Sequence, residues 1–371
     1  MRQNYQISIA RTAYHKACTT LLPALKSGAL CFLLSASLLF SACSAAEKPA
    51  TTAQLESSYH RAWELLEENT MFPDRLSDWK HWEHRYDGKL KNKKDLEEAL
   101  TSMISSLSDE YTYFRNEEET QTCHKHDEDY SVVSACRLPQ NVAYIAIHSF
   151  SSLHTANELE SALQQIDSAC GIILDLRGNR GGYVEQALLC YELLSNEGTF
   201  TSMKGREEGK PYSEMLVVEE NFLKRVINGS IFWESRRKNL SGKAPLVVLV
   251  DVDTRSAAEM LAGALRDTRR AKLVGGKTFG KGVVQSSWNL EAGCSIKIAM
   301  ARYFLPSGAD INGTGIMPDF YIDFQGKEKP KEIKTGGLSN AIPRLLESSP
   351  GILKSLFQTS EPHRISASAG R

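Results

Sequence analysis

The stretch from Pro245 to Gln285 reads PLVVLVDVDTRSAAEMLAGALRDTRRAKLVGGKTFGKGVVQ. Its apolar run Leu246–Val250 predicts a buried strand. The segment Ala257–Asp267 carries its apolar residues on one side, which predicts an amphipathic helix. A second apolar run, Ala271–Val274, predicts another strand and leads into a glycine-rich turn. Strand, helix and strand together indicate one unit of an α/β domain.

The residues around this unit continue the same alternation. Strands are expected at Tyr144–Ile147, Gly171–Leu176 and Ser295–Leu305, and helices at Thr155–Ile166 and Val184–Leu194. Such repetition is typical of a layered α/β domain. The glycine-rich run Asp175–Gly182 then follows a strand, where such folds place their sites. A phosphate-binding loop is an alternative for that run, but it lacks the G-x-G-x-x-G spacing and the P-loop lysine.

Ser256 stands at the start of the predicted helix, where free N–H groups and the helix dipole can stabilise a developing oxyanion. A serine hydroxyl is a weak nucleophile until a base takes its proton, and a lysine can be that base if burial lowers its pKa toward about 7–8. Lys281 follows in the glycine-rich turn. If the chain is extended from Lys281 to Gln285, both side chains face one side, so Gln285 can orient the amine.

These residues also have ordinary structural interpretations. Ser256 can be a helix N-cap, and Lys281 can be a surface charge. Glu259 is interpreted as a first-turn acid that the helix dipole favours. Arg255 either repels a protonated Lys281 and lowers its pKa, or points to solvent. The residues alone leave these alternatives open.

The surrounding motifs resemble the carboxyl-terminal processing, or tail-specific, Ser–Lys peptidase family. They are AGAL (Ala262–Leu265), TFGKG (Thr278–Gly282), DLRGNRGG (Asp175–Gly182), YFLPSGADINGTGIMPD (Tyr303–Asp319) and LSDEYTYF (Leu107–Phe114). The resemblance covers Leu55 to Asp323. It implies a layered peptidase core of the ClpP/crotonase-like type with an N-terminal helical region, and it implies that no metal or cofactor is needed.

The resemblance also implies a role for each matched residue. Ser256 would be the nucleophile, Lys281 the general base and Gln285 the third catalytic residue, and the N–H of Ala257 with that of Gly181 or Gly182 would form the oxyanion hole. The implied reaction is hydrolysis of a peptide bond through an acyl-enzyme. We expect the substrate to add as a strand to a sheet edge.

Residues 115–140 leave no room for the PDZ domain that many members of this family carry. The segment has 26 residues, whereas domains rarely fall below about 50, so we expect a polar linker. A disulfide between Cys123 and Cys136 is predicted for an exported chain. A metal site at Cys123–Asp127 is the less favoured alternative, because these residues form a solvated charge run. Buried free thiols are expected at Cys170, Cys190 and Cys294.

Residues 1–43 resemble an export signal. Basic residues precede the apolar run Ala29–Ala42, which is too short to span a bilayer as a helix. Leu39–Cys43 resembles a bacterial lipobox, with Cys43 as the lipidated residue, and Ser44 resembles the residue of lipoproteins sorted to the outer membrane. A plain secretory signal or an uncleaved anchor is the alternative. The expected location is the bacterial cell envelope, lipid-anchored at the periplasmic face of the outer membrane.

The remaining organisation follows from composition. We expect a tether at 44–51, an N-terminal helical region at 52–114 with helices Leu55–Glu68, Leu76–Tyr86 and Lys94–Leu107, the linker at 115–140, the peptidase core at 141–325 and a polar tail at 326–371. The charged insertion Arg206–Lys243 is either a lid over a cleft or a surface excursion. The net charge of −1 argues against a nucleic-acid partner.

The sequence therefore predicts an envelope-anchored serine endopeptidase with a Ser256–Lys281 dyad assisted by Gln285. Its expected partners are protein or peptide substrates and the membrane, which it contacts through the lipid anchor. The sequence does not identify a regulatory adaptor. Two alternatives stay open. One is a catalytically silent peptide-binding or adaptor lipoprotein on a peptidase fold. The other is a Ser–Lys amidase that acts on cell-wall peptides or β-lactams.

Overall fold

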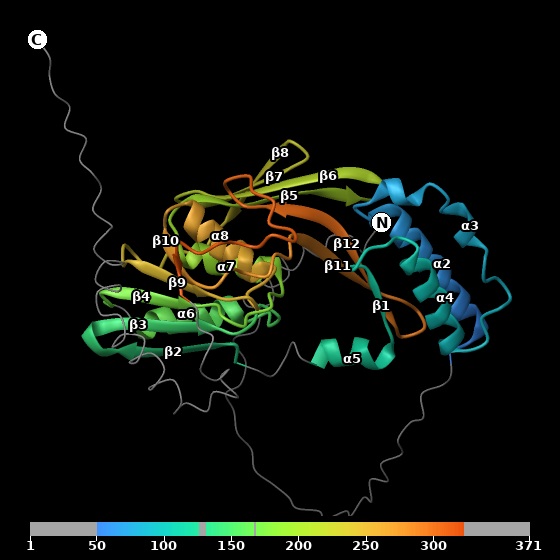
Figure 1. Cartoon of the computed structure of the whole chain (residues 1–371), viewed down its shortest axis with the longest axis horizontal. Coiled ribbons are helices and arrows are strands. Elements are labelled where there is room, and N and C mark those ends of the chain that lie inside the picture. The colour runs from blue at the N-terminus through green and yellow to red at the C-terminus, as the bar shows by residue number, and fades with distance from the viewer. Residues whose placement is uncertain (1–49, 126–130, 167, 323–371) are drawn as a thin grey trace, which may run out of the picture. The chain divides into compact units, whose positions relative to one another are not determined.

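Two β-sheets enclose a layer of helices in the computed structural model, which describes residues 50–125, 131–166 and 168–322 (Figure 1). Helix α8 (Ala257–Asp267) is central, because it packs against β5 (Gly198–Glu207) of one sheet and β10 (Ala271–Gly275) of the other. Every residue of α8 from Ala257 to Leu265 is buried. The helix that follows Ser256 is therefore fixed on both sides.

The first sheet has the strand order β13-β10-β9-β4-β3-β2. Besides β10, its strands are β2 (Val133–Leu138), β3 (Val142–Ile147), β4 (Gly171–Asp175), β9 (Leu246–Val250) and β13 (Phe320–Tyr321). Neighbours run parallel except β2, which is antiparallel to β3. The carboxyl ends of β4, β9 and β10 therefore meet at one edge of the sheet.

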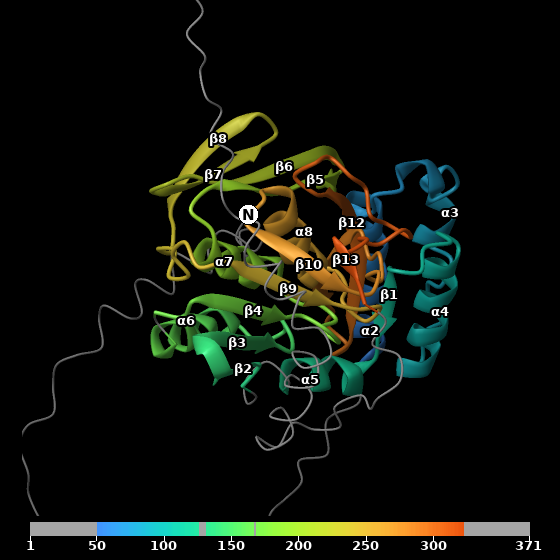
Figure 2. The same cartoon turned by 60° about the vertical axis from the view of Figure 1, so that its left-hand side comes forward.

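Helices α6 (Thr155–Gln165) and α7 (Val184–Leu194) accompany α8 on one face of this sheet (Figure 2). Buried side chains of these helices and of both sheets form one apolar core. The apolar runs of β4 and β9 are buried along their whole length, as expected for strands in a covered parallel sheet. The predicted α/β fold class is confirmed.

The second sheet is antiparallel, with the order β1-β12-β5-β6-β7-β8 and with β11 paired to β12. Besides β5, its strands are β1 (Tyr113–Arg115), β6 (Lys210–Val218), β7 (Phe222–Ile227), β8 (Ser230–Ser235), β11 (Val283–Asn289) and β12 (Ser295–Phe304). The charged insertion 206–243 thus mainly extends this sheet. A role as a lid stays a prediction.

The N-terminal helical region is formed by α2 (Thr52–Asn69), the 3₁₀ turn η1 (Pro73–Leu76), α3 (Lys80–Glu83) and α4 (Lys93–Ser105). Its buried residues share a second core with β12. The continuous helix expected at Leu76–Tyr86 was wrong. Side chains of α2 bind main-chain carbonyls in that segment: Trp63 Nε1 donates to Trp79 O at 3.1 Å, and Tyr59 OH donates to Trp82 O at 2.6 Å.

The segment predicted as a polar linker contains regular structure. Helix α5 (Glu117–Lys125) follows β1, and β2 joins the first sheet, so the core begins before residue 141. The sequence pattern did not indicate β2, because most of its residues are exposed or half-buried at the sheet edge and form no apolar run. Cys136 on β2 is an exposed free thiol, which gives no support to the predicted disulfide; the side chain of Cys123 lies outside what the structure describes.

Three other expectations concern exposure or position. Cys190 and Cys294 are buried free thiols as expected, but Cys170 is exposed, with its thiol donating to Gln140 O at 2.9 Å. The predicted signal, the lipidation residue Cys43 and the polar tail lie outside the described residues. No helix in the described ranges is both long and apolar enough to cross a membrane.

Candidate active site

Three loops meet at the amino end of α8, each following the carboxyl end of a parallel strand. The loop after β9 leads into Ser256, the loop after β4 is the DLRGNRGG run, and the loop after β10 is the TFGKG run. The Arg255 N–H donates to Asn179 O at 3.0 Å, and the Phe279 N–H donates to Thr254 O at 3.0 Å. The turn that carries Ser256 is therefore hydrogen-bonded to both neighbouring loops.

Ser256 has a backbone conformation that residues with side chains rarely adopt, with φ of 58° and ψ of −125°. Such outliers cluster at functional sites. A serine on a strained strand-to-helix turn forms the nucleophile elbow, which exposes the hydroxyl at the top of a sheet. Gly181 permits this turn, because a Cβ at position 181 would lie 2.8 Å from both Ser256 Cβ and Arg255 O.

Lys281 has the environment of a lysine that can lose its proton. Its amine is partly buried, and burial lowers its pKa; the positive charges of Arg255 and Arg115 lower that pKa further. The structure thus favours the first interpretation of Arg255, although its guanidinium also pairs with Asp253 at 2.8 Å. A neutral amine near physiological pH is what a general base requires.

Gln285 orients the Lys281 amine and links it to the N-terminal region. Its Oε1 accepts a hydrogen bond from Lys281 Nζ at 2.5 Å, and its Nε2 donates to Tyr111 O at 2.5 Å. Lys281 Nζ also lies 5.6 Å from the centre of the Tyr111 ring. The side-chain contact between Lys281 and Gln285 was predicted, whereas the part played by Tyr111 was missed.

Glu259 has a larger role than the first-turn acid we predicted. It is fully buried. Its Oε1 accepts from Thr278 Oγ1 at 2.5 Å and from the Gly280 N–H at 2.7 Å, and its Oε2 accepts from the N–H groups of Ser256 and Lys281, both at 2.9 Å. Burial raises the pKa of this carboxyl, and the four hydrogen bonds oppose the rise. One carboxylate therefore joins the turns of Ser256 and Lys281.

The backbone next to Ser256 offers donors for an oxyanion. Ala257 is the first residue of α8, so its N–H has no partner within the helix. Gly181 packs on this amide, but its own N–H donates to Asn179 Oδ1 at 2.8 Å and is not free for an oxyanion. Of the two predicted glycines, Gly182 is therefore the better candidate, together with Ala257.

Comparison with known proteins assigns a family to the part of the chain that carries this site. Residues 141–322, which contain the three loops, match the family model described as peptidase family S41. This part of the chain is a peptidase family S41 domain. The predicted resemblance to carboxyl-terminal processing peptidases is confirmed at the level of the family.

Curated proteins that are similar to this chain are named carboxyl-terminal processing proteases. The chain is 30% identical over 201 residues to a carboxy-terminal-processing protease of Bartonella bacilliformis, covering 53% of this chain and 42% of the relative. It is 38% identical over 189 residues to a carboxyl-terminal-processing protease of Synechocystis, covering 50% and 39%. The carboxy-terminal processing protease CtpA of Bacillus subtilis is 36% identical over 180 residues, covering 48% and 34%. The match thus spans less than half of each relative.

Two solved structures share the fold around the S41 domain. One, described as the photosystem II D1 C-terminal processing protease, has a TM-score of 0.56 at 18% identity and covers 74% of this chain and 94% of its own. The other, described as a lipoprotein from Streptococcus agalactiae, has a TM-score of 0.57 at 17% identity and covers 81% and 96%. At such identities the likeness concerns the fold alone.

Residues 303–319 of the S41 domain support the loop that carries Lys281. The Gly282 N–H donates to Asn312 Oδ1 at 3.1 Å, and the Thr278 N–H donates to Ile316 O at 3.1 Å. The third sequence motif thus belongs to the site as a scaffold for the loop. It shapes the TFGKG turn, and its buried Tyr303 also reaches the nucleophile turn, because the Tyr303 OH donates to Ser256 O at 3.3 Å.

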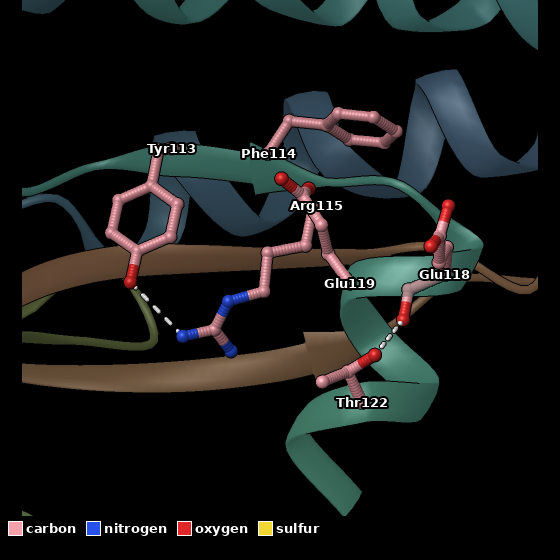
Figure 3. A pocket seen from close by; sticks show the side chains of 6 residues that line it. All are labelled: Tyr113, Phe114, Arg115, Glu118, Glu119 and Thr122. Carbon is pink, nitrogen blue, oxygen red and sulfur yellow. Dashed lines mark hydrogen bonds between the residues drawn. The ribbon is translucent and has the colours of Figure 1, made fainter.

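A pocket of about 370 Å³ lies beside β1 and α5 (Figure 3). Its lining residues are Tyr113, Phe114, Arg115, Glu118, Glu119 and Thr122. The Arg115 guanidinium donates to Tyr113 OH at 3.0 Å and points away from the carboxylates of α5. The charge of Arg115 is also one of the causes that lower the pKa of Lys281, after burial and Arg255.

Proposed function

We propose that the protein is a serine endopeptidase of the cell envelope, which hydrolyses peptide bonds in proteins or peptides. The observation that carries the proposal is the strained turn of Ser256, joined through Glu259 to the loop of a lysine whose pKa is lowered. An ordinary capping box would account for the bond from the Ser256 N–H to Glu259. A plain helix N-cap and a surface lysine would require neither the strained backbone nor a carboxylate shared with the loop of Lys281.

The residues suggest the following course of reaction. Neutral Lys281 takes the proton of the Ser256 hydroxyl as its oxygen attacks the substrate carbonyl, and the N–H groups of Ala257 and Gly182 stabilise the oxyanion. The lysine then gives that proton to the leaving amine as the peptide C–N bond breaks. Water, deprotonated by the same lysine, hydrolyses the acyl-enzyme and restores Ser256.

The loops of the site present apolar side chains to solvent. Tyr183 is 40% exposed, Phe279 42% and Val252 64%, and each belongs to one of the three loops. Exposed apolar side chains beside a site favour an apolar ligand. We therefore propose extended, unfolded polypeptide as the substrate class. Because residues 115–140 contain no PDZ domain, recognition of a substrate carboxyl terminus would need a different binding site.

The location is proposed from the sequence. Residues 1–43 would act as a lipoprotein signal, and Cys43 would carry the lipid that holds the protein in the envelope. The outer membrane, with the protein on its periplasmic side, is the proposed site of anchoring because Ser44 follows the lipidated cysteine. Labelling with a radioactive fatty acid should be lost in Cys43→Ala, and retained labelling would contradict the anchor.

The test of the activity is cleavage of an unfolded protein such as casein by the full chain. Wild type should cut, whereas Ser256→Ala and Lys281→Ala should not. Lys277→Ala is the matched control, because Lys277 is an exposed lysine of the same loop. If the folded wild type is inert and a serine-directed acylating probe fails to label Ser256, the peptide-binding alternative holds. Acylation of Ser256 by a β-lactam, without casein cleavage, would favour the amidase.

A further inference from the structure

Two histidines and one aspartate converge in the N-terminal helical region. His60 lies on α2, His84 directly follows α3, and Asp87 lies in the loop beyond it. His60 Nε2 lies 3.1 Å from Asp87 Oδ1, and His84 Nδ1 lies 3.0 Å from Asp87 Oδ2. One potential ligand atom of each residue lies within 4.8 Å of the other two. This cluster has no part in the proposed peptidase mechanism.

We propose that His60, His84 and Asp87 bind a divalent transition-metal ion such as zinc. Imidazole nitrogen and carboxylate oxygen are ordinary zinc ligands, and three protein ligands with solvent in the fourth position make a complete tetrahedral set. Imidazole also selects against magnesium and calcium, which prefer all-oxygen sites. The chemistry of the donor set therefore favours zinc, nickel or copper over the hard cations.

The distances are close to those that zinc requires. With zinc bonds of about 2.0–2.1 Å, two ligand atoms in a tetrahedral site lie about 3.3 Å apart. His60 Nε2 lies 3.1 Å from Asp87 Oδ1 and His84 Nδ1 lies 3.0 Å from Asp87 Oδ2. Both distances approach this value, but they end on different oxygens, so the Asp87 carboxylate would rotate to give one oxygen to the ion. The two rings, whose centroids are 5.6 Å apart, would move together slightly. Their side chains are 34% and 70% exposed, so rotation of the rings meets little packing.

The backbone that carries the three ligands is held in place. Glu56 and Tyr59 precede His60 on α2 by four residues and by one. The Gly88 N–H donates to Glu56 Oε1 at 2.9 Å, and Tyr59 OH donates to Trp82 O at 2.6 Å, so α2 holds both ends of the segment that contains His84 and Asp87. Such preorganisation reduces the cost of gathering ligands that are far apart in sequence.

A neighbouring carboxylate can orient one of the ligands. Glu83 Oε1 lies 3.7 Å from His84 Nε2, the ring nitrogen opposite the proposed ligand atom Nδ1. Histidine ligands of zinc commonly give their second N–H to a carboxylate, which fixes the ring and its tautomer. The metal would thus join α2 to the loop between α3 and α4, and so stabilise the helical region.

The chain contains a matched control for this proposal. His81 Nδ1 lies 3.1 Å from Asp78 Oδ2, so it forms a histidine–aspartate pair of the same kind. It is absent from the three-ligand cluster identified among the described residues. His81→Gln therefore removes an exposed histidine from the same segment without removing a proposed ligand.

The test is titration of the full chain, free of any polyhistidine tag, with zinc chloride in a calorimeter, and with magnesium chloride as the hard-ion comparison. We expect one equivalent of zinc to bind at pH 7.5 and to raise the Tm by several degrees. His60→Gln and His84→Gln should weaken that equivalent at least about tenfold, whereas His81→Gln should not.

Two outcomes would overturn the proposal. One is zinc binding that is the same in wild type, His60→Gln and His84→Gln, which would place the ion on other residues. The other is no zinc binding by a wild type whose circular dichroism and Tm show that it is folded. Because the side chains of His60 and His84 are 34% and 70% exposed, both variants should keep the wild-type Tm in EDTA, so lost binding can be distinguished from lost folding.

Discussion

Glu259 accepts the backbone N–H of Lys281 at 2.9 Å through Oε2, the same oxygen that accepts the N–H of Ser256. The buried carboxylate thus couples the first turn of α8 to the glycine-rich loop, although 22 residues separate Glu259 from Lys281. The geometry of the proposed dyad depends on a residue that takes no direct part in proton transfer. Glu259 is in this sense a positioning residue.

Glu259→Gln should impair both stability and turnover. An amide of the same shape offers one acceptor oxygen in place of two, so donors that now bind Oε1 or Oε2 would be left unpaired. Each unpaired buried donor costs about 1–3 kcal/mol. Urea unfolding should show this loss, and kcat should fall more than KM rises. Glu291→Gln, an exposed substitution, should change neither quantity, and a fully active Glu259→Gln would contradict the role.

The pH dependence should report the lowered pKa of Lys281. Because the free amine is the reactive form, kcat/KM should rise with pH through a pKa below the ordinary lysine value of about 10.4. Arg255→Gln or Arg115→Gln removes a positive charge that disfavours the protonated amine. Either change should therefore raise the pKa of Lys281 and move the rising limb of the pH profile of kcat/KM to higher pH.

The control for the pH experiment is Arg180→Gln, because the Arg180 side chain is 73% exposed and only approaches Asp253 at 3.9 Å. Its pH profile should match that of wild type. A limb that moves to lower pH in Arg255→Gln, or that stays in place in both test variants, would mean that another group titrates.

The sequence predicted the elements that carry strong periodic patterns. The helix Ala257–Asp267 and the strand Leu246–Val250 have the bounds expected, because a one-sided apolar helix and an apolar run between polar residues are local signals. The contact of Lys281 with Gln285 was also predictable, since their spacing places both on one side of an extended chain. Local patterning thus specified the two central elements and one pair of site residues.

Long-range hydrogen bonds could not be predicted from local sequence patterns. Nothing in the spacing of Glu259 indicates that Thr278, Gly280 and Lys281 share its carboxylate, and nothing near Gln285 indicates that its partner is Tyr111 O, 174 residues away. The order of the strands brings these segments together. The hydrogen bond from the Gly181 N–H to Asn179 Oδ1 is local, since two residues separate the partners, but we did not predict it.

Gly181→Ala should disrupt the Ser256 turn through a clash with the backbone. An added Cβ would lie 2.8 Å from Ser256 Cβ and from Arg255 O, and φ at position 181 is +86°. Gly178→Ala is the matched control, because φ there is +74° but nothing lies within 4 Å of the added Cβ. In both variants the left-handed backbone should lower the free energy of unfolding by about 1–2 kcal/mol. The clash should lower it further in Gly181→Ala.

Activity separates the two glycine variants most clearly. Gly178→Ala should keep most of the wild-type kcat, whereas Gly181→Ala should lose nearly all turnover because the nucleophile is displaced. Casein cleavage and the urea midpoint measure the two effects. Equal stability and equal activity of the two variants would show that Gly181 does not set the position of Ser256.

Ser256→Gly should be more stable than Ser256→Ala, although neither should cleave substrate. The backbone at φ of 58° and ψ of −125° strains any residue with a Cβ, whereas glycine adopts it readily. Relief of that strain should be worth about 1–3 kcal/mol, partly offset by the greater freedom of glycine in the unfolded chain. Urea unfolding of the two variants measures the difference. If the alanine variant is equally stable or more stable, the turn does not store strain at the nucleophile, and the comparison with a nucleophile elbow loses its physical basis.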